Sequence, residues 1–292
     1  MDQELHGCAT KLITEFFKKT SKRTSSSISS VKVLKQYKNI DVICIINEIY
    51  WILIEDKTGT KNHSNQLDRY LIEVEKSGIK RENILPIYFK TEDQSNYNDV
   101  VSSGYEPFLR PDFLTILNGY PGQNNILIDY RNRLKDITTK TESYLSLPPE
   151  KWSRRSWVGF YQRLQIELGT GNWDYVANPS GGFLGFWWNS QGPSDCRQYI
   201  QIEENTLCIK IKVIEKNRRR ELRSKWSKLT INKAKDFGFK LTRPRRFGSG
   251  KFMTVSIYKD YREFTDGSIN ISNTLSKLKN AEDILHDLES IV

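Results

Sequence analysis

Residues 40–57, with the sequence IDVICIINEIYWILIEDK, decide the fold of the first half of the chain. Two apolar runs, 42–46 and 50–54, stand on either side of a short polar break at Asn47 and Glu48. Apolar runs of this length around a break of this kind predict a β-hairpin with a short connection.

Charged residues stand at the open end of this hairpin. Asp41 begins its first strand, and Glu55, Asp56 and Lys57 end its second strand. Residues i and i+2 of a strand point to the same face, so Glu55 and Lys57 share a face and Asp56 points to the other. We therefore expect two carboxylates, Asp41 and Glu55, and one ammonium to converge at one end of a sheet.

Such a group favours the chemistry of a bound cation. Two carboxylates this close repel each other unless a cation lies between them, and Mg²⁺ is the usual hard divalent ion for oxygen ligands. Lys57 can neutralise charge in a phosphorane-like transition state, or position or deprotonate an attacking water. Taken alone, the same residues are also typical of a solvated strand end and of a turn acid that opens a strand.

The patterns on either side of the hairpin complete an α/β core. They predict a mixed central sheet flanked by helices, because a strand, a hairpin, a crossover helix and a further strand follow one another. The expected strands are 31–37 and 83–89, and the expected amphipathic helices are 5–19 and 65–76. Residues 93–111 look irregular, and helical patterns follow at 113–117 and 126–137.

A proline pair, Pro148-Pro149, predicts the boundary between two domains, residues 1–147 and residues 148–292. The second domain is predicted to be a basic α+β domain that binds nucleic acid, recognises a partner or mediates dimerisation. Its patterns predict a helix at 151–168, short antiparallel strands, a basic helix at 218–237, a hairpin between 239–242 and 252–258, and a C-terminal helix at 271–291.

The excess of positive over negative charge lies almost entirely in this second domain. Residues 1–147 hold 20 Lys or Arg against 19 Asp or Glu, and residues 148–292 hold 25 against 16. A single basic cluster is more typical of a solvated helix face, but three clusters interleaved with aromatic residues favour a phosphate-rich partner. The expected nucleic-acid contacts are Arg218, Arg219, Arg220, Arg223, Arg243, Arg245 and Arg246.

The aromatic stretch at residues 183–188 leaves two interpretations open. It offers rings on which nucleic-acid bases can stack. The interpretation that we favour at this point is a sheet face packed against a helix.

Several classes of protein are disfavoured. No apolar run is long enough to cross a bilayer, and the acidic, polar first residues do not resemble a secretory signal. The four cysteines form no CxxC pair, which disfavours a zinc site or a disulfide framework and fits a reducing cytoplasm. His63 is interpreted as an exposed loop residue, and no glycine-rich segment continues as a phosphate loop.

The ordered combination of these features resembles the PD-(D/E)XK nuclease superfamily. Thirteen residues separate Asp41 from Glu55-Asp56-Lys57, and Gln66-Leu67-Asp68-Arg69-Tyr70 follows on the next helix. The resemblance is closest to bacterial members of the superfamily and is best over residues 31–90. It implies a restriction-endonuclease-like core and phosphodiester hydrolysis with one or two Mg²⁺, or with Mn²⁺.

The resemblance also implies roles for individual residues. Asp41 and Glu55 would bind metal, together with Asp56 through its backbone carbonyl. Lys57 would orient water and stabilise charge, and Gln66 would support the site. Glu15 on the first helix, with Glu4 behind it, is the candidate for a further metal contact.

The sequence departs from the family pattern at two points. There is no proline before Asp41, and Lys35 and Gln36 stand on the strand where many relatives carry an acid.

The function that we expect is a Mg²⁺-dependent endonuclease acting on DNA, in restriction or anti-phage defence with a protein partner. Because two cuts in a duplex need two active sites, we expect a homodimer. The alternatives are an RNA-directed nuclease and a catalytically inactive nucleic-acid-binding protein that keeps the fold.

Overall fold

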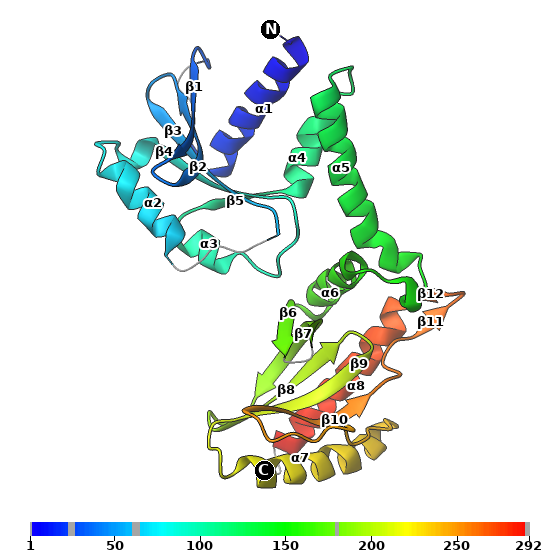
Figure 1. The fold of residues 1–292 in the computed structure, drawn as a ribbon. Coiled ribbons are helices and arrows are strands. Elements are labelled where there is room, and N and C mark those ends of the chain that lie inside the picture. The colour runs from blue at the N-terminus through cyan, green and yellow to red at the C-terminus, as the bar shows by residue number, and fades with distance from the viewer. Residues whose placement is uncertain (1, 23–26, 60–64, 179–180, 290–292) are drawn as a thin grey trace. The chain divides into compact units, whose positions relative to one another are not determined.

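The structure, a computed structural model, describes residues 2–22, 27–59, 65–178 and 181–289. His63 lies outside these residues, so its interpretation stays a prediction. The chain divides into two compact units, residues 1–138 and residues 139–292 (Figure 1).

The division falls inside helix α5 (Asn125–Glu142), and not at the proline pair that the sequence suggested. The reason is that the last turns of this helix pack into the second unit. Thr141 is buried, and a Cβ on Gly159 would lie 1.9 Å from the Thr141 carbonyl oxygen.

The first unit contains the mixed sheet that the sequence predicted, but with five strands in place of the expected four. Its strands lie in chain order, the first three antiparallel and the last three parallel. They are β1 (Val31–Tyr37), β2 (Ile40–Ile46), β3 (Tyr50–Lys57), β4 (Ile84–Lys90) and β5 (Glu106–Leu109). Strand β5 corrects the expectation of an irregular segment at 93–111. It has four residues, one of them Pro107, and is too short to show an alternating pattern.

Helices cover both faces of this sheet (Figure 1). On one face, α1 (Gln3–Lys19), α4 (Arg110–Asn118) and α5 bury apolar residues against β2, β3, β4 and β5. On the other face, α2 (Gln66–Glu75) and α3 (Asn98–Ser102) do the same. The three layers together form the restriction-endonuclease-like core that the sequence predicted.

Two tight turns fix the register of the antiparallel strands. Lys38 and Asn39 both have positive φ between β1 and β2, and Asn47 and Glu48 do the same between β2 and β3. Turns with two left-handed residues match the twist of paired strands. They place the start of β2 beside the end of β3, which is where the acidic residues lie.

The second unit is an antiparallel sheet with helices on one face. Its strands are ordered β10-β9-β8-β7-β6, and a core cluster joins them to α6, α7 and α8. The strands are β6 (Asn172–Asn178), β7 (Gly181–Gln191), β8 (Cys196–Glu203), β9 (Thr206–Val213) and β10 (Phe252–Tyr258), with a small pair, β11 (Phe264–Thr265) and β12 (Ser268–Ile269). The helices are α6 (Arg154–Leu168), α7 (Arg219–Lys233) and α8 (Ile271–Glu289).

The predicted hairpin between residues 239–242 and 252–258 is wrong. Strand β10 pairs with β9 over its length, and only an isolated bridge, Thr242 to Ile257, joins it to the earlier segment. Phe239 and Leu241 instead enter the core. Across the described residues, no helix combines the length and the apolar character that a membrane span needs.

Candidate functional site

The hairpin brings Asp41 and Glu55 together from neighbouring strands. Val42 pairs with Ile54, so the next residues outward along β2 and β3 are these two acids. The backbone N–H of Asp56 donates to Asp41 Oδ2 at 3.0 Å, which ties the acid of β2 to the end of β3. The predicted convergence at one end of the sheet is therefore present.

Glu55 is the buried centre of the group, with only 1% of its surface exposed. Lys57 Nζ lies 2.6 Å from Glu55 Oε1, as the i+2 spacing suggested. Gln66 Nε2 donates to the same oxygen at 2.9 Å. The other oxygen, Glu55 Oε2, is buried and has no hydrogen-bond partner in the described part of the chain.

Helix α2 supplies the support on this face of the sheet. The side-chain nitrogen of Gln66 also donates to the Tyr70 hydroxyl at 2.6 Å, and Lys57 Nζ lies 3.5 Å from Gln66 Oε1. Gln66 and Tyr70 are four residues apart and so lie one turn apart on the same side of the helix. The sequence motif contained Tyr70, but its contact with Gln66 was not predicted.

Gln36 is a second contact that the sequence did not predict. Its Nε2 donates to Asp41 Oδ1 at 3.3 Å from a backbone with φ of 52° in β1. It stands on the strand where many superfamily relatives carry an acid. Here an amide donor meets the acid of β2, so this strand adds no negative charge at Gln36.

The electrostatics of the site favour an added cation. Burial raises the pKa of the Glu55 carboxyl, the Asp41 charge raises it further, and the Lys57 ammonium opposes both. Tyr105 is buried nearby, and burial together with the Glu55 charge raises the pKa of its hydroxyl. Lys57 therefore offsets only part of the cost of ionising Glu55, and a cation bound beside Asp41 and Glu55 would offset more of it.

The oxygen donors present fit a hard divalent ion. Mg²⁺ keeps several waters and is often held by only one or two carboxylates. Asp41 and Glu55 supply two carboxylates, and Glu55 Oε2 is a buried oxygen without a partner. Among the described residues, no group of three or more His, Cys, Asp or Glu has the arrangement of a complete metal site.

The other acids suggested by the sequence do not join this pair. The Glu15 carboxylate bonds to Lys11 and Lys18 on its own helix, at 3.1 and 2.8 Å. Glu4 accepts a hydrogen bond from the backbone of Asn124 at 3.0 Å. Asp56 has an exposed side chain, and only its backbone borders the site.

The seven predicted arginines of the second unit have different environments. Arg218 pairs with Asp195 at 2.7 Å, and Arg219 donates to the carbonyls of Val213 and Ile214. Arg223 is buried and holds the loop after residue 242 by donating to the Gly248 carbonyl at 2.7 Å. Exposed side chains remain at Arg220, Arg243, Arg245 and Arg246.

The role of Arg223 is therefore mainly structural. Its guanidinium lies 4.0 Å from the centre of the Phe247 ring, and that of Arg243 lies 3.9 Å from the same ring. The sequence did not distinguish Arg223 from the exposed arginines, because the burial of Arg223 depends on the path of a loop more than twenty residues away.

Comparison with known proteins agrees with the geometry of the first unit. A family model described as the PD-(D/E)XK nuclease superfamily matches residues 2–146. Searches among curated proteins and among solved structures give no match.

Proposed function

Residues 2–146 belong to the PD-(D/E)XK nuclease superfamily, and from this premise we propose that the chain is a Mg²⁺-dependent endonuclease acting on DNA. The observation that carries the proposal is the state of Glu55. It is an almost fully buried carboxylate beside Asp41, with Lys57 and Gln66 on one oxygen and no partner on the other. Burying an ionised carboxylate costs free energy unless the charge is paired or binds a metal, and groups perturbed in this way cluster at functional sites.

The acids would hold the metal and fix its position. Asp41 and Glu55 supply the carboxylate oxygens, and the Asp56 carbonyl is the third candidate donor. When bound, a divalent ion supplies Lewis-acid stabilisation of the charge that develops on the phosphate and lowers the pKa of bound water. The hydrogen bonds of Gln36 and of the Asp56 backbone orient Asp41 for this role.

Lys57 and Gln66 would act on the reacting groups and on their orientation. Lys57 is half-buried and fixed against Glu55, so its ammonium reaches the open end of the sheet with little freedom. From there it would neutralise charge on a phosphate oxygen and position the attacking water. Gln66 fixes the side chain of Glu55 and is itself fixed by Tyr70.

The substrate and its setting form the finer part of the proposal. The excess of positive charge in residues 148–292 supports a phosphate-rich partner, with the exposed Arg220, Arg243, Arg245 and Arg246 as contacts. The family resemblance supports DNA as substrate, a homodimer for two cuts, and a role in restriction or anti-phage defence with a protein partner. A phage challenge of cells expressing wild type or Glu55→Gln tests the last point.

The deciding experiment incubates the full chain with plasmid, linear duplex DNA, single-stranded DNA and RNA. Each substrate is tested with Mg²⁺, with Mn²⁺ and with EDTA. We expect metal-dependent cutting of DNA, including linearisation of the plasmid. Cutting of RNA alone would move the proposal to an RNA-directed nuclease, and binding without cutting under any metal would indicate an inactive member of the superfamily.

Gln66→Ala gives a more specific prediction about positioning. Without the amide, Glu55 and Lys57 lose their common partner, so we expect kcat to fall about 10- to 100-fold while KM changes less than about twofold. The matched control is Arg69→Ala, an exposed residue on the same helix. A parallel loss of thermal stability, or a change confined to KM, would contradict the positioning role.

A further inference from the structure

Strand β7 decides between the two interpretations of the aromatic stretch. Leu184, Phe186 and Trp188 are buried in the core of the second unit, whereas Phe183 and Trp187 alternate with them and point to the opposite face. The helices α6, α7 and α8 contribute to that core and so cover only one face of the sheet. The stretch is thus partly core and partly an open surface.

The register places further aromatic and basic residues on the same open face. Residues that pair directly across antiparallel strands point to the same side. The pairs on this face are Trp187 with Gln201, Tyr199 with Lys210, Arg197 with Lys212, and Lys212 with Phe252. Gly185 also lies on this face, and the side chains of Phe183 and Gln201 close over it, within 3.2 and 3.3 Å of where a Cβ would stand.

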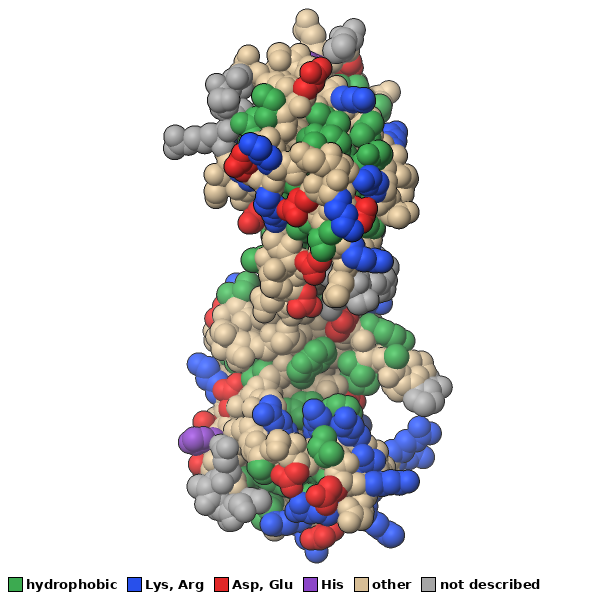
Figure 2. All heavy atoms as spheres, turned by 90° about the vertical axis from the view of Figure 1, so that its left-hand side faces the viewer, with side chains coloured by type: hydrophobic (Ala, Val, Ile, Leu, Met, Phe, Trp, Pro, Cys, Tyr) green, Lys and Arg blue, Asp and Glu red, His purple; other side chains and the backbone are tan. Residues whose placement is uncertain are grey.

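These residues line a hollow of about 860 Å³. Its walls include Phe183, Trp187, Tyr199, Lys212 and Phe252, and 57% of the surface of Phe252 is exposed. Figure 2 shows hydrophobic and basic side chains gathered around a hollow on the second unit, in the lower half of the view. A hollow of this size is in the range of sites for organic ligands.

The charges on this face are mainly positive. Arg197 and Lys251 are exposed, and the ammonium groups of Lys212 and Lys251 lie 5.9 and 6.0 Å from the centre of the Phe252 ring. Of the acids on this face, Glu203 is paired with Lys210 at 2.5 Å, and Asp174 lies at the β6 edge beside Gly185. Rings with cations beside them suit a ligand that has both flat bases and phosphates.

We propose that the open face of the second sheet binds single-stranded nucleic acid. Bases stack on Trp187 and Tyr199, and phosphates lie near Arg197 and Lys212. Stacking on a flat sheet requires bases whose faces are exposed, which a single strand offers and a duplex does not. The site is separate from the acidic pair of the first unit, and its binding does not depend on cleavage.

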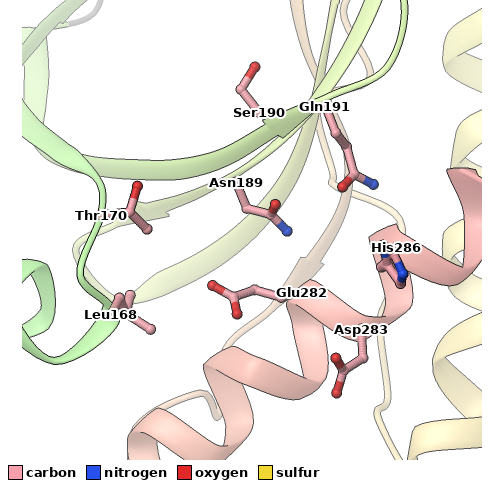
Figure 3. A pocket seen from close by; sticks show the side chains of 8 residues that line it. All are labelled: Leu168, Thr170, Asn189, Ser190, Gln191, Glu282, Asp283 and His286. Carbon is pink, nitrogen blue, oxygen red and sulfur yellow. The ribbon is translucent and has the colours of Figure 1, made fainter.

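A neighbouring hollow limits the path that the single-stranded nucleic acid can take (Figure 3). It shares Thr170, Asn189 and Ser190 with the aromatic hollow, but α8 adds Glu282 and Asp283 to its lining. In Figure 3, Glu282 extends from α8 below Asn189, and its carboxylate accepts a hydrogen bond from the Trp188 indole N–H at 2.5 Å. Because carboxylates repel phosphates, the proposed path of the nucleic acid runs over β7, β8, β9 and β10 and not into this hollow.

The test is fluorescence anisotropy of the full chain with labelled oligonucleotides of one sequence as single-stranded DNA, single-stranded RNA and duplex, in EDTA so that nothing is cut. Trp187→Ala and Tyr199→Ala should each weaken single-strand binding at least about fivefold. Arg197→Ala and Lys212→Ala should each lower the slope of log affinity against log salt by about 0.7. The controls are Tyr175→Ala, an exposed aromatic on the other face of the sheet, and Lys279→Ala on α8.

Preference for DNA or for RNA among the single strands identifies the ligand, and either result supports the proposal. Equal or tighter binding of the duplex, or affinities of both aromatic variants within twofold of wild type, would overturn it. If a variant unfolds, ultraviolet crosslinking of the wild-type chain to a single-stranded oligonucleotide replaces the binding measurement on that variant. Crosslinks mapped to residues 183–212 or to Phe252 support the proposal, and crosslinks confined to other segments refute it. If the chain binds single strands as predicted but cuts no substrate, the nuclease proposal fails and the binding proposal stands.

Discussion

We expect Glu55→Gln to abolish metal-dependent cleavage, with a loss of at least about 10³-fold, or roughly 4 kcal/mol of activation free energy. The amide keeps the shape of the side chain but removes the charge that would bind the cation beside Asp41. Because burial raises the pKa of Glu55, the ionised carboxylate is costly in the metal-free protein, so removing the charge leaves the fold intact. Initial rates under saturating Mg²⁺ measure the loss.

The control for this substitution is Glu73→Gln, an exposed acid on the helix that also bears Gln66. It should cut at close to the wild-type rate. Thermal melts of both variants without metal should stay near the wild-type curve. A Glu55→Gln protein that retained more than a tenth of the wild-type rate would place the catalytic centre elsewhere.

Lys57→Met is expected to lower the rate about 10²- to 10³-fold, the loss seen when one well-placed transition-state contact is removed. Methionine keeps an unbranched side chain and removes only the charge. Lys57 also lowers the pKa of Glu55, so its loss raises that pKa further. In the proposed mechanism Glu55 acts ionised, so activity should be present above its pKa and lost as the pH falls through it. The acid limb of the pH–rate profile should therefore move to higher pH in Lys57→Met.

Rates measured between pH 5 and pH 9 separate these two effects. Lys76→Met, an exposed lysine beside the C-terminal end of α2, should leave both the plateau and the acid limb unchanged. An unchanged acid limb in Lys57→Met would disprove the electrostatic link between Lys57 and Glu55. A plateau within threefold of the wild type would disprove its role in the transition state.

The fold of the first unit was largely predictable because its signals are local. The apolar runs 42–46 and 50–54 can be buried only as neighbouring strands, and the two-residue period then fixes the face of Glu55 and Lys57. The helix with Gln66 has a regular apolar stripe. By contrast, the short β5 depends on its parallel pairing with β4, which no local pattern reveals.

The predictions for Glu15, for the pairing of β10 and for the division of the units differ from the structure. Glu15 has Lys11 and Lys18 one helical turn away, a spacing that already favoured ion pairs on its own helix. The partner of β10 is β9, with the whole of α7 between them in the sequence, so the nearer segment was a misleading candidate. The division of the units inside α5 reflects the packing of Thr141 against Gly159. The proline pair lies further along, in the connection between α5 and α6.

The central claim is that Asp41 and Glu55 together hold a divalent ion at the open end of the β2–β3 hairpin. Mn²⁺ binding followed by electron paramagnetic resonance tests it most directly, because the signal of free Mn²⁺ falls as the ion binds. We predict that the wild type binds Mn²⁺, that Mg²⁺ displaces it, and that Asp41→Asn and Glu55→Gln each lose at least 90% of the binding at the same concentrations. Binding by both variants equal to that of the wild type would contradict the claim.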